Sequence, residues 1–131
     1  MKKIQNHLSI WVVICLMTTC RSLVITTLET DLFEKTLDRT PDPQLVDVRT
    51  PEEYAEGHLP GAILMDVREK TFDSLIQQLD RNRPVFVYCR VGRRSLEAAK
   101  ILEKNKFKIV YDLDGGIIGW KDMGKEVVIS D

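Results

Sequence analysis

Residues 85–95 read VFVYCRVGRRS, and this stretch sets a cysteine between a strand pattern and a helix pattern. Val85 to Tyr88 are four apolar residues in a row, as expected for a strand that is covered on both faces. A helical pattern begins at about Arg94. Because a strand that runs into a helix is the repeating unit of parallel sheets, Cys89 is predicted at the carboxyl end of a central strand.

The sequence on both sides repeats this alternation. Further strands are predicted over 23–28 and 45–48, within 62–67, and over 108–111. Helices are predicted from Thr30, which we expect to be the cap, from Thr50 to Gly57, over 71–80, over 94–104, and around Trp120. The helix over 94–104 is expected to face inward with Leu96, Ala99 and Leu102. Turns are predicted at 40–43 and 114–116. The pattern indicates an α/β domain with a largely parallel sheet.

Composition limits the functions that are open to this chain. Its 131 residues are close to the size of one ordinary domain, and 44% of them are hydrophobic. The formal net charge of −1 gives no general attraction to nucleic acid or to anionic lipid. The arginines at positions 90, 93 and 94 therefore form a local cluster in a balanced chain.

The first twenty residues differ from the rest. Lys2 and Lys3 precede an uncharged ten-residue run over 8–17, which is too short to span a bilayer and has the layout of a secretory signal peptide. Residues 16–20, LMTTC, resemble the lipobox of bacterial lipoproteins, although Met17 and Thr19 depart from its usual residues. We therefore expect a signal peptide over 1–20, lipidation at Cys20, and a periplasmic or membrane-anchored domain over 21–131. The alternatives are an uncleaved anchor or a mis-assigned start.

Removal of residues 1–19 would also remove Cys15, and lipid on Cys20 would leave Cys89 without a disulfide partner in the chain. A lone thiol in an oxidising compartment needs a functional reason. The amides at the start of a helix carry partial positive charge and stabilise a thiolate, the nucleophilic form of cysteine. Gly92 permits a curled loop whose N–H groups point inward. The competing interpretations are that Cys89 is a buried apolar residue and that each arginine is a solvated charge.

The stretch Cys89-Arg90-Val91-Gly92-Arg93-Arg94-Ser95 resembles the active-site loop of rhodanese domains, the thiosulfate sulfurtransferases. Similar segments lie in order along residues 24–129. They are LVDVRTPEEYAEGHLPGAI (45–63), AAKIL (98–102) and VYDLDGGIIGW (110–120).

The resemblance implies a three-layer α/β/α fold and a sulfur transfer that passes through a cysteine persulfide, from an anionic donor such as thiosulfate to cyanide or a thiol. In this chain it implies Cys89 as nucleophile. The implied substrate-binding residues are Arg90, Val91, Gly92, Arg93 and Arg94. It implies no metal or cofactor, small-molecule donors and acceptors, a thiol-bearing protein as a further acceptor, and no nucleic acid.

Four further positions bear on the resemblance, three outside the loop and one within it. Asp47 and Arg49 are expected to support the site from the neighbouring strand end, or else to form an ion pair that stabilises the fold. His58 lies in a Gly-His segment that is mainly structural in the family. Val91 stands where many single-domain members have Ser, so one hydroxyl donor is absent from the loop.

Two other functions stay open. Cysteine-dependent phosphatases and arsenate reductases place five residues between Cys and Arg, whereas four residues separate Cys89 from Arg94. The shorter loop favours one sulfur atom over a tetrahedral oxyanion. A non-catalytic rhodanese-like binding module is the second alternative, although such modules usually lack the cysteine.

Overall fold

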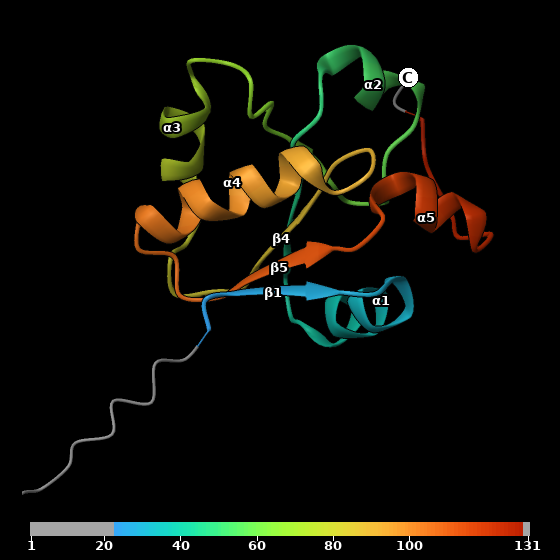
Figure 1. The fold of residues 1–131 in the computed structure, drawn as a ribbon, viewed down its shortest axis with the longest axis horizontal. Helices are drawn as coiled ribbons and strands as arrows, with labels where there is room; N and C mark the ends of the chain where they lie inside the picture. Colours follow the sequence, from blue (N-terminus) through green and yellow to red (C-terminus); the bar gives the residue numbers. More distant parts are fainter. Residues whose placement is uncertain (1–22, 130–131) are drawn as a thin grey trace, which may run out of the picture.

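A central sheet of five parallel strands organises the chain in the computed structural model, which describes residues 23–129 (Figure 1). The strands lie in the order β1-β5-β4-β2-β3, so β4 is central. The strands are β1 (Ile25–Leu28), β2 (Gln44–Asp47), β3 (Ile63–Leu64), β4 (Val85–Tyr88) and β5 (Val110–Leu113). The helices are α1 (Thr30–Arg39), α2 (Pro51–Glu56), α3 (Phe72–Leu75), the 3₁₀ turn η1 (Ile76–Gln78), α4 (Arg93–Lys104) and α5 (Gly116–Asp122).

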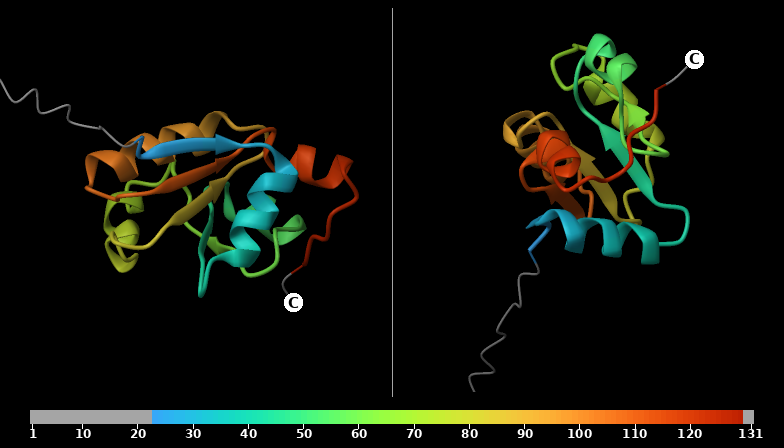
Figure 2. Two further views of the ribbon diagram at one scale, coloured as in Figure 1. Left: turned by 90° about the horizontal axis from the view of Figure 1, so that it is seen from below. Right: turned by 90° about the vertical axis from the view of Figure 1, so that its right-hand side faces the viewer.

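Helices cover the sheet on both faces, which gives two separate cores (Figure 2). Along β4, Val85 and Val87 pack on the face with α3 and α4, whereas Phe86 and Tyr88 pack on the face with α1 and α5. Successive side chains of a strand point to opposite faces, so a fully apolar strand requires a cover on each side. The expected three-layer α/β/α architecture with a parallel sheet is confirmed.

Helix α2 begins and ends at the residues that the sequence predicts. The Glu53 N–H donates to Thr50 Oγ1 over 3.3 Å, and the Thr50 N–H donates to Glu53 Oε2 over 3.1 Å. Both halves of a capping box are therefore made, with Pro51 at the start of the helix. Gly57 ends the helix with a φ of 147°, which favours glycine.

Two predicted helix details are wrong. Thr30 does not cap α1, since Glu29 takes that position without a side-chain bond and Thr30 is the first helical residue, buried against the core. The helix expected over 71–80 is one turn of α3 followed by η1, where the Leu79 N–H donates to the Ile76 carbonyl. The tighter turn still buries Phe72, Ile76 and Leu79, so the apolar spacing is satisfied without a long helix.

Two further predictions are wrong in part. Ala99 and Leu102 of α4 are buried as expected, but Leu96 is exposed, and Ser95 and Ala98 are the other buried residues of this helix. The last strand covers Val110–Leu113 and not 108–111, since Val110 pairs with both Ile25 and Val85. This register carries Asp112 into the core, a position that strand propensity disfavours.

The expected signal peptide over 1–20, with Cys20, lies outside the described residues. No helix within residues 23–129 is long and apolar enough to cross a membrane.

Candidate active site

Cys89 follows β4 directly, at the carboxyl end of the sheet, where parallel α/β folds bind ligands. Its Sγ accepts the Gly92 N–H over 3.1 Å and lies 3.4 Å from the Ser95 hydroxyl. The residue is only 1% exposed, yet it lines a cavity of about 490 Å³. Cys89 thus belongs to the core cluster and also lines the cavity.

The loop after Cys89 is shaped by Gly92. This residue has a φ of 106° and is the N-cap of α4, the left-handed conformation expected for it. The turn directs the Gly92 N–H at the sulfur, and α4 begins with the next residue. The partial positive charge of a helix N-terminus therefore adds to a direct amide hydrogen bond, and both stabilise a thiolate.

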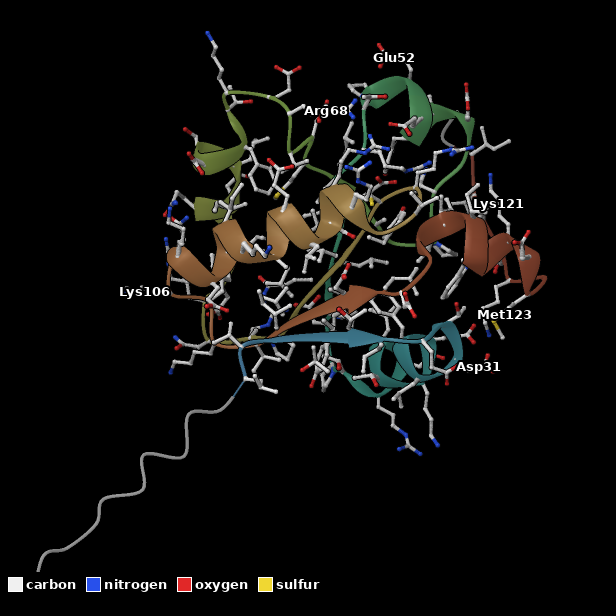
Figure 3. The ribbon with its side chains drawn as sticks, in the orientation of Figure 1. Asp31, Glu52, Arg68, Lys106, Lys121 and Met123 are labelled. Carbon is white, nitrogen blue, oxygen red and sulfur yellow. The ribbon has the colours of Figure 1, made fainter. Side chains whose placement is uncertain are left out.

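Four arginines surround the cavity. Three are the expected Arg90, Arg93 and Arg94 of the loop, and Val91 and Glu97 complete the wall near them. Arg68 is the fourth and was missed by sequence reasoning. It comes from the segment between β3 and α3, and in Figure 3 it lies above the N-terminal end of α4. Nothing in the sequence around Arg68 marks it, because only the fold brings it to Cys89.

Arg94 has a second partner. Its guanidinium donates to both carboxylate oxygens of Glu53, over 2.7 and 2.8 Å. The hydrogen bond from Arg94 lowers the pKa of Glu53 to about 2. Arg94 therefore ties α4 to α2 while it lines the cavity, and part of its charge is balanced.

Asp47, the last residue of β2, and Arg49 do not line the cavity. They form a buried ion pair at 2.6 Å, and Arg49 also donates to the Gly57 carbonyl over 2.7 Å. The Tyr88 hydroxyl donates to Asp47 Oδ2 over 2.6 Å, and burial raises the pKa of that hydroxyl. Since Tyr88 precedes Cys89, the pair fixes the strand end that carries the cysteine.

The rear of the loop is held by α5. The Ile117 N–H donates to the Cys89 carbonyl over 2.9 Å, and the Ile118 N–H donates to the Arg90 carbonyl over 3.2 Å. Gly116 precedes them with a φ of 58°. A Cβ on Gly116 would lie within 2.6 Å of the Cys89 carbonyl oxygen and closer still to that of Arg90. Gly116, which the sequence shows only as part of a turn, thus makes a close backbone contact behind Cys89.

His58 lies outside the cavity wall. Its ring stacks on Tyr54 with centroids 3.7 Å apart, and its backbone bridges Val128. This placement agrees with the structural role expected for His58. Within residues 23–129, no group of three or more His, Cys, Asp or Glu side chains could hold a metal ion.

Comparison with known proteins agrees with this geometry. The family model of the rhodanese-like domain matches residues 29–123. A relative from Allochromatium vinosum named sulfurtransferase is 31% identical over 105 residues, which are 80% of this chain and 96% of the relative. The crystal structure of a rhodanese-like domain protein from Staphylococcus aureus is 29% identical with a TM-score of 0.70, covering 81% of this chain and 99% of its own. The solution structure of protein hp1203 from Helicobacter pylori is 30% identical with a TM-score of 0.62, covering 80% of this chain and 90% of its own. The chain belongs to the rhodanese-like domain family.

Proposed function

We propose that this protein is a sulfurtransferase that carries a sulfane sulfur on Cys89 as a persulfide. The observation that carries the proposal is the position of Sγ, which receives the Gly92 amide at the floor of a cavity bordered by four arginines. An amide and a helix N-terminus stabilise the anion both before and after the sulfur is added, because thiolate and persulfide carry the same charge.

The transfer proceeds in two displacements. The Cys89 thiolate attacks the sulfane sulfur of thiosulfate, a new S–S bond forms, and sulfite leaves with the electron pair of the broken bond. Cyanide or a thiolate then attacks the outer sulfur of the persulfide, and the Cys89 thiolate is regenerated. Each step exchanges one anion for another, which is the ping-pong chemistry of covalent catalysis.

The cavity favours an anionic donor. Arg94 already pairs with Glu53, whereas the side chains of Arg68, Arg90 and Arg93 line or border the cavity without an ion pair within residues 23–129. These three cations can balance a dianion such as thiosulfate as it approaches the thiolate. Val91 lines the cavity and is half-exposed, and its side chain has no hydroxyl to donate to a substrate. The sulfur donor is therefore selected mainly by its charge.

The test is a sulfur-loading experiment on the domain with intact-protein mass spectrometry. Wild type incubated with thiosulfate should gain one sulfur atom on Cys89 and lose it on addition of cyanide, with thiocyanate released. Cys89→Ser should do neither, while Met123→Ala, an exposed site away from the cavity, should behave as wild type. A wild-type protein that never gains sulfur would support a binding module, and turnover of a phosphate ester instead would support a phosphatase.

We further propose that the chain is exported and attached to the membrane through lipid on Cys20. The basic start, the short apolar run and the LMTTC segment support this proposal. Fractionation of cells that express the full chain or Cys20→Ala tests it. The wild type should be found with membranes and the variant should not.

A further inference from the structure

Asp112 is a buried carboxyl that the sulfur-transfer scheme above does not use. It lies in β5, in register with Val87 of β4 and Thr27 of β1, and is 3% exposed. Thr27 Oγ1 donates to its Oδ2 over 3.3 Å. Its Oδ1 is buried and has no hydrogen-bond partner among the described residues. Because an unsatisfied buried oxygen is costly, its presence one strand away from the nucleophile calls for an explanation.

Ser95 contacts Cys89 and lies on α4, the helix that packs against the strand of Asp112. It belongs to the first turn of α4, is fully buried, and its Oγ accepts the Cys89 thiol over 3.4 Å. Burial raises the pKa of the Asp112 carboxyl, and the hydroxyls of Ser95 and Thr27 oppose that rise. Helix α4, which carries Ser95, packs against β5, which carries Asp112, yet no hydrogen bond reaches Asp112 Oδ1, so this oxygen is able to accept one. Since Ser95 has one proton to donate, it can serve the sulfur or the carboxylate but not both.

We propose that Asp112 is a positioning residue that acts through Ser95 to set the protonation state of Cys89. With Asp112 charged, the Ser95 proton turns to the carboxylate and Ser95 Oγ accepts the Cys89 thiol. With Asp112 neutral, its acid proton is donated to Ser95 Oγ, and the Ser95 proton is donated to the sulfur anion. The inference deepens the proposed function and rests on it, since Cys89 is taken as the sulfur nucleophile.

The exchange between these arrangements balances. The Sγ–H bond breaks as Ser95 Oγ takes that proton, and the Ser95 proton passes to the Asp112 carboxylate. One thiolate appears and one carboxylate becomes neutral, so the net charge does not change and no oxidant is needed. The two acids then share one proton and titrate as a coupled pair.

Other charges near the pair come from several elements. Asp114, from the end of β5, opposes ionisation of Asp112, and Arg94 of α4 acts on Cys89. The remaining charged residues of the cavity wall are Arg68, Arg90, Arg93 and Glu97. All of these stay unchanged in the substitutions below except Asp114, which serves as the control.

The test measures the rate of Cys89 alkylation by iodoacetamide against pH, in wild type, Asp112→Asn, Ser95→Ala and the double variant. Asn is neutral and keeps a donor for Ser95, so Asp112→Asn should move the midpoint of the profile about one pH unit lower and speed alkylation about tenfold on its acid side. In the Ser95→Ala background this shift should disappear. Asp114→Asn removes a neighbouring carboxylate that is exposed, so it should move the midpoint from the wild-type value by less than about a third of that shift.

Two results overturn the inference. One is an Asp112→Asn profile that superimposes on the wild type, and the other is a shift that persists without Ser95, which would mean a direct effect of charge. Should Asp112→Asn not fold, NMR of the Asp112 carboxyl carbon in the wild type provides the same test. Its titration should move when Cys89 is blocked by alkylation, and an unmoved titration refutes the coupling. Because alkylation requires no sulfur donor, these outcomes are separate from a failure of sulfur loading.

Discussion

Replacing Gly116 by Ala should displace the loop that carries Cys89. The added methyl group would meet the carbonyl oxygens of Cys89 and Arg90, which are backbone atoms that cannot rotate away. Those carbonyls are also held by hydrogen bonds from Ile117 and Ile118, so the loop cannot yield without losing them. We expect both stability and sulfur transfer to fall.

The magnitude follows from two separate costs. The φ of 58° places Gly116 in the left-handed region, which costs alanine about 1–2 kcal/mol. The lower entropy of the unfolded chain offsets about 0.4–1 kcal/mol of this. Overlap with packed backbone adds about 1–3 kcal/mol. The total is about 3 kcal/mol, which would lower Tm by roughly 10–20 °C in a domain of this size.

Gly115→Ala is the matched control. Gly115 has a φ of 73°, so it pays the same backbone cost, but its added Cβ would meet its nearest atom at 3.8 Å. Urea unfolding should show Gly116→Ala about 1–3 kcal/mol less stable than Gly115→Ala. Sulfur transfer at a temperature where both are folded should fall by about 10²-fold in Gly116→Ala alone, the scale of a 1 Å misplacement. Equal stabilities and equal rates would refute the steric argument.

Three further substitutions test other contacts. Asp112→Asn should be more stable than wild type at pH 7. Burial raises the pKa of the Asp112 carboxyl in the folded protein, so its contribution to the free energy of unfolding is present below pH 3.8 and is lost as the pH rises through the pKa of the folded state. Glu53→Gln should lose about 1 kcal/mol at pH 7, because its bonds to Arg94 are partly exposed. That loss should shrink as the pH falls from 4.5 toward 2, where the wild-type carboxylate becomes protonated. Tyr88→Phe should cost about 1–3 kcal/mol, since Asp47 loses a buried donor.

Chemical unfolding at several pH values checks all three. A constant difference between Asp112→Asn and wild type from pH 3 to 8 would contradict the raised pKa. A Glu53→Gln variant as stable as wild type at pH 7 would mean that the pair with Arg94 contributes nothing. A Tyr88→Phe variant with unchanged stability would show that Asp47 is satisfied by Arg49 alone.

Much of the site follows from local chemistry in the sequence. The apolar run before Cys89 indicates a strand covered on both faces, and Gly92 indicates a loop that must curl before a helix. The capping box of Thr50 and Glu53 indicates where α2 begins. Each of these signals acts within a few residues, so no knowledge of the rest of the chain is required.

The parts that escaped prediction depend on contacts between distant segments. Arg68 reaches the cavity from a loop whose own sequence is unremarkable, and Glu53 finds Arg94 across 41 positions. Asp112 falls just beyond the strand predicted over 108–111, because strand propensity counts against aspartate. Only pairing with β1 and β4 on either side forces it into the sheet.

The parallel sheet has one more consequence. Every strand points the same way (Figure 1). Ile25, the first residue of β1, therefore lies at the opposite end of the strands from Cys89, which follows the last residue of β4. An affinity tag, a bead or an acyl chain joined ahead of Ile25 would therefore be attached at the end of the domain away from the cavity. The cavity and its arginines would face the solution, where soluble donors and the exposed thiols of other proteins could reach them.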